Sequence, residues 1–192
     1  MACKGTRPNP WFAAALLALS AGCASSATTG EGLEPRAPAF SQGPMRVERP
    51  DQWQFVAPDD SVAADTVIIL QGPVGDHLLA PVIEISRRPL TAADRRRRPV
   101  HLLTSLMTET VQYFAGFEVK GEPQPLEVGG KPGAQVRMRL TEMLEDGQTV
   151  ARRAQFYGVV TGGDMWLIRC IGPADGSVSG VFSQVIESLS FS

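Results

Sequence analysis

Three clusters of turn residues in the C-terminal half of the sequence most narrowly limit the fold that this chain can adopt. Residues 129–133, the pair Asp146-Gly147 and the pair Gly162-Gly163 separate stretches with the length and composition of β-strands. These stretches are expected at residues 118–128, 134–144, 148–160 and 164–171. Strands that follow one another through tight turns must pair antiparallel. We therefore expect an antiparallel sheet at the centre of the fold.

The second of these strands has a regular alternation of apolar and polar side chains. Ala134, Val136, Met138 and Leu140 alternate with Gln135, Arg137, Arg139 and Thr141. A strand points successive side chains to opposite faces. This pattern predicts one face in the core and one face in water.

The preceding part of the chain predicts shorter strands and one helix. Trp53 is expected to be a core aromatic at the start of a strand, and two more strands are expected at residues 66–70 and 81–86. Thr91 marks a helix start with a short first turn. Because a proline interrupts that turn, we expect the main helix from Pro99 to Ala115.

A final helix is predicted from the spacing of apolar residues near the C-terminus. Asp175 or Ser177 is expected to cap its start. The apolar residues recur at helical spacing and define one stripe that must dock on the sheet: Val178, Val181, Phe182, Val185, Ile186 and Leu189.

The N-terminal residues have the organisation of an export signal. Lys4 and Arg7 form a basic region, and residues 11–19 form an apolar run. That run is too short to cross a bilayer as a helix, which takes about 20 residues. We expect residues 1–22 to be a signal peptide that is removed.

The end of this signal resembles a bacterial lipobox. Small residues precede the cysteine in Leu19-Ser20-Ala21-Gly22-Cys23, with Ser20 at the position where leucine is usual. We expect Cys23 to receive diacylglycerol and to anchor the protein to a membrane. Ordinary secretion and an uncleaved anchor are the alternatives.

The segment after this cysteine is composed of small residues and prolines. It has too few apolar side chains to order itself. We expect residues 23–44 to be the lipidated cysteine and a flexible tether with a reach of roughly 25 Å. Residues 45–192 are then expected to form a single domain.

Charge and cysteine content argue against a nucleic-acid-binding protein and against a domain held together by an intrachain disulfide. Removal of residues 1–22 lowers the count of Lys and Arg from 18 to 16 against 20 acidic residues, which gives a net charge of −4. We therefore expect no nucleic-acid partner, which would call for a basic surface.

Cys3 leaves with the signal and Cys23 is acylated, so Cys170 has no partner for an intrachain disulfide. The apolar run around Cys170 indicates a buried thiol rather than a nucleophile.

The order of elements and several local motifs resemble the PsbP/Mog superfamily. Its bacterial envelope branch, the DcrB and LpqN type of lipoprotein, is the most similar. The motifs lie between residues 45 and 192: Pro50 to Trp53, Gly72-Pro73, the hairpin at Gly133-Ala134, Phe156-Tyr157-Gly158 and Leu189-Ser190-Phe191.

This resemblance implies an α+β fold of the PsbP type. The antiparallel sheet would carry helices on both faces, as an α/β/α sandwich. It also implies a protein without catalytic activity, since members of the superfamily support photosystem II assembly or bind a small GTPase. The motifs do not transfer the partner-binding residues of those relatives.

The residues that usually carry catalysis are scarce. His77 and His101 are the two histidines, and no nucleophile elbow, zinc-binding, dithiol or nucleotide-binding motif occurs. We expect no enzymatic activity and no cofactor. A hydrolase built from distant residues remains the less favoured alternative.

Three acidic residues form a weak candidate metal site. Oxygens of Asp59, Asp60 and Asp65 could hold a hard cation such as calcium, but their spacing does not match a calcium loop. The favoured interpretation is a solvated turn, and we expect no metal.

Arginines form the densest charge in the sequence and the candidate binding surface. Four of them beside a membrane-tethered domain could contact anionic headgroups or phosphate, and simple solvation is the alternative. The candidate surface consists of Arg87, Arg88, Arg95, Arg96, Arg97 and Arg98.

Aromatic side chains provide a further possibility. Trp53, Trp166, Phe156 and Tyr157 are expected in the core, with a pocket for a small apolar ligand between sheet and helix as the alternative.

The sequence therefore predicts a lipid-anchored protein of the cell envelope that acts as a non-catalytic interaction or assembly module. Its expected partners are the membrane, through Cys23, and an envelope protein. Ala24 follows that cysteine instead of an aspartate that retains lipoproteins at the inner membrane. In a diderm organism we expect the periplasmic face of the outer membrane. A lipoprotein that carries a small ligand is the alternative function.

Overall fold

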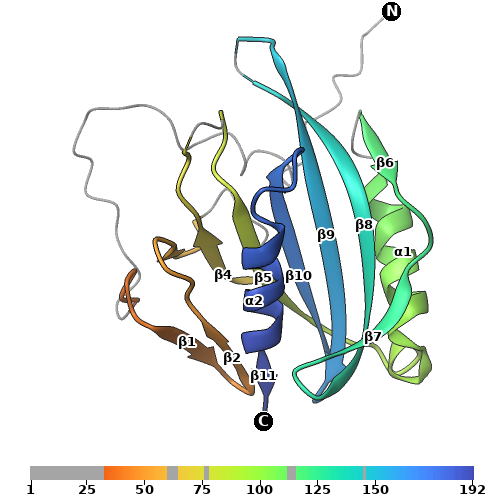
Figure 1. Ribbon diagram of the computed structural model, residues 1–192. Helices are drawn as coiled ribbons and strands as arrows, with labels where there is room; N and C mark the ends of the chain where they lie inside the picture. The colour runs from red at the N-terminus through yellow and green to blue at the C-terminus, as the bar shows by residue number, and fades with distance from the viewer. Residues whose placement is uncertain (1–32, 60–64, 76–77, 112–115, 145) are drawn as a thin grey trace, which may run out of the picture.

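A large antiparallel sheet dominates the computed structural model, which describes residues 33–59, 65–75, 78–111, 116–144 and 146–192 (Figure 1). Its eight strands are ordered β3-β4-β5-β10-β9-β8-β6, and β7 also pairs with β8. They are β3 (Gln54–Val56), β4 (Thr66–Gln71), β5 (Val82–Pro89), β6 (Phe117–Val119), β7 (Gln124–Val128), β8 (Lys131–Met143), β9 (Thr149–Thr161) and β10 (Asp164–Pro173). All of their pairings are antiparallel, which confirms the expected sheet.

A second, smaller sheet joins the beginning of the described chain to its end. It has the order β1-β2-β11, with β1 at Ala39–Gln42, β2 at Met45–Glu48 and β11 at Ser190–Phe191. Leu33 packs against the core, and the carbonyl of Pro35 accepts a hydrogen bond from the Phe55 amide at 2.9 Å. The prediction of a tether up to residue 44 is therefore wrong from Leu33 onward, because its few large side chains pack on the core.

Two α-helices and one short 3-10 helix complete the described part of the chain. Helix α1 spans Pro99–Val111, the 3-10 helix η2 spans Asp94–Arg96, and α2 spans Ser179–Ser188. The amide of Asp94 bonds to the Thr91 hydroxyl at 3.2 Å, as expected for the helix start. The last predicted residues of the main helix, 112–115, lie outside the described residues.

Two details of the local predictions are wrong. The strand expected at residues 118–128 is divided into β6 and β7, because Gly121 turns the chain with a φ of 88°. The residue that precedes α2 is Val178, which provides no side-chain cap. Asp175 instead accepts a hydrogen bond from the Ser177 amide at 2.9 Å, in the loop before the helix.

Two hydrophobic clusters draw on alternate residues of β9. One cluster contains Tyr157 and Val159 together with the α2 residues Phe182 and Val185. The other contains Ala154 and Phe156 of β9, Leu102, Leu103 and Met107 of α1, and Ala134, Val136, Met138 and Leu140 of β8. The apolar residues of β8 that the alternation assigned to the core are thus the ones that pack with α1.

Helix α2 approaches the sheet at a glycine. A Cβ atom on Gly172 of β10 would lie 2.5 Å from Cγ2 of Val178 and 3.0 Å from Cζ of Phe182. Any side chain at this position would push the start of α2 away from the sheet. Gly172 therefore fixes where α2 lies on β10.

Candidate interaction surfaces

Cys23 and the whole export signal lie outside the described residues, as do Asp60 and His77. Within the described ranges, none of the helices is long and apolar enough to cross a membrane.

Arg87 lies on the face of the sheet that carries α2. Its Nε donates to the Asp164 carboxylate at 2.8 Å, and its guanidinium lies 5.7 Å from the ring centroid of Trp166. Arg88 is the next residue of β5, so it points to the opposite face. Both arginines belong to the predicted basic surface, and the sheet separates them.

The remaining predicted arginines lie around η2. Arg97 forms an ion pair with Asp94 at 3.3 Å and donates to the Ser105 hydroxyl at 2.6 Å. A hydrogen bond from Thr91 and another from Arg97 lower the pKa of the Asp94 carboxyl. Arg95 lies beside Gly163, in the turn before β10.

Arg96 and Arg98 are exposed. The structure therefore places Arg95 to Arg98 around η2, where Asp94 balances part of their charge, whereas Arg87 pairs with Asp164.

Of the three candidate acidic residues, Asp59 and Asp65 lie within the described part of the chain. Asp65 uses its backbone carbonyl to accept a hydrogen bond from the Arg87 amide at 2.8 Å. Among the residues that the structure describes, no group of three His, Cys, Asp or Glu side chains is placed to hold a metal ion.

Cys170 and the four aromatic residues belong to the core. Cys170 is fully buried, and burial raises the pKa of its thiol. Burial also raises the pKa of Tyr157 to about 12, while its hydroxyl donates to Gln155 at 2.7 Å. Trp53, Phe156, Tyr157 and Trp166 are all at most 5% exposed. This confirms the core assignment and leaves Cys170 unsuited to nucleophilic chemistry.

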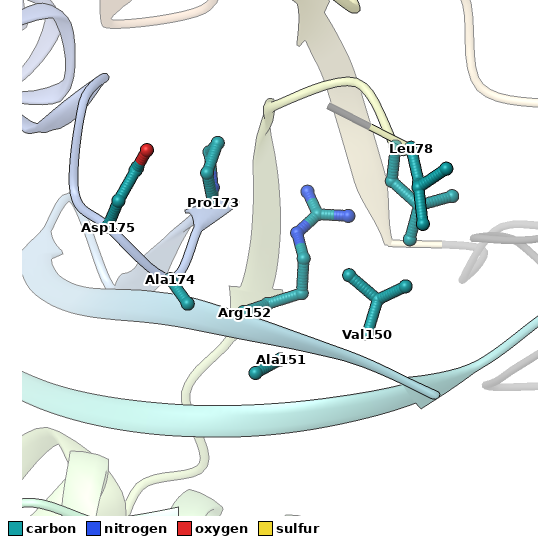
Figure 2. Close-up of a pocket in the computed structure, with 8 residues that line it drawn as sticks. Leu78, Val150, Ala151, Arg152, Pro173, Ala174 and Asp175 are labelled. Atoms are coloured by element: carbon teal, nitrogen blue, oxygen red, sulfur yellow. The ribbon is translucent and has the colours of Figure 1, made fainter. Parts of the chain in front are cut away.

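A small cavity of about 250 Å³ lies beside the first half of β9. Figure 2 shows the guanidinium of Arg152 between Pro173 and Leu78. The other lining residues are Leu79, Val150, Ala151, Ala174 and Asp175. The cavity lies away from the predicted cleft between sheet and helix, since no residue of α1 or α2 lines it.

Arg152 is a buried structural charge. It is 4% exposed and donates to the carbonyls of Gly172, Ala80 and Ile171 at 3.2, 2.8 and 3.3 Å. It also pairs with Glu142 at 3.2 Å. Burial lowers the pKa of Arg152 and raises the pKa of Glu142. For each group, the cost of removing its charge from water therefore outweighs the attraction to its partner. Arg152 thus ties β9 to β8, β10 and the loop before β5.

The sheet carries an exposed charge cluster that the sequence alone does not predict. Arg137 and Arg139 of β8 are exposed on the same face, and Arg139 lies directly opposite the exposed Arg153 of β9. We call Arg137, Arg139 and Arg153 the arginine face. None of the ion pairs within the described residues includes them. Helix α2 lies in front of β5 and β10, whereas no helix crosses in front of β8 and β9 (Figure 1).

One signal for this surface was present in the sequence. The alternation in β8 places Arg137 and Arg139 on the side away from the core. Arg153 joins them only through the pairing of β8 with β9, which depends on the register of the hairpin.

Comparison with solved structures identifies the fold. Cyanobacterial PsbP (CyanoP) from Synechocystis sp. PCC 6803 aligns with a TM-score of 0.57 at 11% identity, over 80% of this chain and 91% of that protein. LpqN of Mycobacterium tuberculosis, described as involved in cell envelope biogenesis, aligns with a TM-score of 0.52 at 14% identity, over 77% of this chain and 83% of that protein. No protein-family model and no curated protein matches the sequence. The chain therefore has a PsbP-like α+β fold, in agreement with the resemblance seen in its motifs.

Proposed function

We propose that this protein is a lipid-anchored component of the cell envelope that acts as a non-catalytic interaction module. The arginine face is the observation that carries the proposal. It is a charged part of a sheet that has neither an intramolecular helix over it nor ion-pair partners among the described residues. Clustered like charges on an exposed face favour association with a partner of opposite charge.

The anchor is proposed on the residues of the export signal. Leu33, the first described residue, is the tenth residue after Cys23. A flexible segment of this length has a root-mean-square reach of roughly 16–19 Å. Acylation of Cys23 would hold the domain close to a membrane, and Ala24 favours the periplasmic face of the outer membrane in a diderm cell. The structural similarity to LpqN, a protein involved in cell envelope biogenesis, supports this location.

The proposal includes a layered arrangement of the domain, with α1 and α2 on opposite faces of the sheet. It is supported by β9, whose alternate residues pack with α1 and with α2. In this arrangement each helix covers only part of one face. The arginine face is the uncovered part beside α2.

A small-ligand carrier is the second candidate, and the cavity beside Arg152 is the feature in its favour. Its volume of about 250 Å³ lies below the roughly 300–1,000 Å³ of typical ligand pockets. Four donor bonds of Arg152 are already made to the protein. Native mass spectrometry of the purified chain tests this alternative, because a carrier would retain its ligand.

Crosslinking in cells tests the main proposal. The full chain is compared with its Cys23→Ala variant, and intact-mass measurement first establishes whether Cys23 carries diacylglycerol. We expect the wild-type chain to be acylated and to give a discrete crosslinked envelope protein. We expect the variant to lose both the acyl mass and most of the crosslink. An unmodified Cys23 would contradict the anchor, and a wild-type chain without a crosslinked partner would contradict the interaction module.

A further inference from the structure

The arginine face contains an unfavourable cross-strand pair. Arg139 and Arg153 are directly opposite each other on adjacent antiparallel strands, where Cβ atoms lie about 5 Å apart. Arg137 adds a third charge on the same face. Like charges in this position destabilise a sheet, so the arrangement costs folding free energy that an anionic partner would recover.

The acidic side chain opposite Arg139 does not neutralise these charges. Glu118 of β6 is opposite Arg139, but its carboxylate is paired with Lys120. The hydrogen bond from Lys120 is the main cause that lowers the pKa of Glu118, and Arg139 contributes only at longer range. The face formed by these five residues therefore has four positive charges and one negative charge.

The position of α2 limits the shape of the partner. Arg153 lies against the loop that leads into α2, since a Cβ atom on Gly176 would be 2.6 Å from its Nη1. A helix with its side chains is about 10–12 Å across. Helix α2 therefore stands beside the arginine face as a ridge that would hold a flat bilayer away from the strands, whereas a narrow polypeptide segment can lie next to it.

The chemistry and spacing of the guanidiniums indicate what such a segment contains. A guanidinium forms paired hydrogen bonds with a carboxylate. Arg137 and Arg139 are two residues apart in β8, a rise of about 6.8 Å. An extended chain repeats its side chains on one side at this same interval. Carboxylates at alternate positions of an extended segment would therefore match the two arginines.

We propose that the arginine face binds an acidic, extended segment of an envelope protein, with Asp or Glu at alternate positions. This inference rests on the proposed function and specifies the partner of the same module. Exposed guanidinium–carboxylate pairs are individually weak and are screened by salt. The interaction is therefore expected to need several pairs at once and to weaken as salt is added.

The test is a calorimetric titration of the full chain in nonionic detergent. The probe is a short synthetic peptide in which glutamate alternates with threonine, and the control peptide has glutamine in place of every glutamate. The test variant is Arg137→Gln, Arg139→Gln, Arg153→Gln. The matched control variant is Arg95→Gln, Arg96→Gln, Arg98→Gln, which removes the same number of charges near η2. Micelles that contain phosphatidylglycerol serve as a second probe.

We expect the wild-type chain and the control variant to bind the glutamate peptide alike. The test variant should bind it about tenfold more weakly or worse, and the glutamine peptide should not bind. Absence of wild-type binding, or equal binding by both variants, would overturn the proposal.

Binding of the phosphatidylglycerol micelles that depends on the arginine face, without binding of the peptide, would also overturn it and identify a lipid surface instead. None of these results alters the crosslinking test in cells, which decides the proposed function separately.

Discussion

Strands β8 and β10 flank β9, yet their surroundings differ. Every residue of β10 is buried or half-buried, whereas β8 alternates buried and exposed residues over most of its length. The side chains Trp166, Ile168 and Cys170 of β10 lie in the cluster with α2. Across β9, Cys170 is level with Arg137 of β8, and Gly172 is level with Arg139. The difference shows that, on one face of the same sheet, the side chains of β10 pack in the core, whereas those of β8 remain available for binding.

The largest expected effect comes from the buried side of this comparison. Trp166→Ala removes a fully buried indole whose ring centroid lies 5.7 Å from that of Phe191. We expect a loss of about 3–5 kcal/mol in the free energy of unfolding, because a large cavity remains. On β8, Arg137→Ala should cost less than about 0.5 kcal/mol. Denaturant unfolding measures both, and similar losses would show that the two regions do not differ.

A smaller effect is expected where α2 meets β10. Gly172→Ala would place a methyl group within 2.5 Å of Val178 and should destabilise the fold by about 1–3 kcal/mol. Gly180→Ala is the matched control, since a Cβ atom there meets nothing within 4 Å and alanine favours a helix by about 0.5–1 kcal/mol. Thermal unfolding should therefore shift in opposite directions. A stabilised Gly172→Ala variant would contradict the direct packing of α2 on β10.

Glu142, near the end of β8, predicts a pH dependence of the stability of the fold. Because burial raises the pKa of Glu142, the folded state holds this proton more tightly than the unfolded state does. Its contribution to stability is full below the unfolded pKa and is lost as pH rises through the folded pKa. Glu142→Gln should remove this slope and change stability by about 1 kcal/mol or less, since an amide oxygen still accepts from Arg152.

Unfolding measured across mildly acidic pH checks this slope. Glu118→Gln on β6 is the control of opposite sign, because the pKa of Glu118 is lowered and its contribution is present above the unfolded pKa. An unchanged slope in Glu142→Gln would show that burial of Glu142 is not its source.

The smallest effect is expected on the arginine face itself. Arg139→Gln relieves the like-charge pair with Arg153, so we expect a gain of a few tenths of a kcal/mol at low salt that disappears at high salt. Denaturant unfolding at two salt concentrations checks this. A loss of stability would mean that Arg139 supports the fold instead of a partner.

The sequence predicted the difference between the two strands but not the binding surface that follows from it. The apolar run at residues 165–171 and the alternation at 134–141 correspond to β10 and β8. The predicted binding surface, Arg87, Arg88 and Arg95 to Arg98, rests on charges that are consecutive in the sequence. Consecutive charges are visible in a sequence, whereas charges that meet across strands are not.

The register of one hairpin explains why Arg153 was missed. A two-residue turn at Asp146-Gly147 would pair Arg139 with Ala154. The structure instead has a longer turn, in which the amide of Leu144 donates to the carbonyl of Gln148 at 2.7 Å. This shifts the pairing by one residue and puts Arg153 opposite Arg139. A shift of one residue exchanges the two faces of a strand, so the position of Arg153 depends on a turn that local signals do not determine.

Site-specific photocrosslinking in cells tests the central claim most directly. A photoreactive residue is placed in the full chain either at Thr141, exposed beside Arg139 on β8, or at Thr104, exposed on α1. The account predicts a discrete crosslinked protein from Thr141, little from Thr104, and loss of the Thr141 product when the arginine face is changed to glutamine. Equal products from both positions, or a Thr141 product that survives those substitutions, would contradict it.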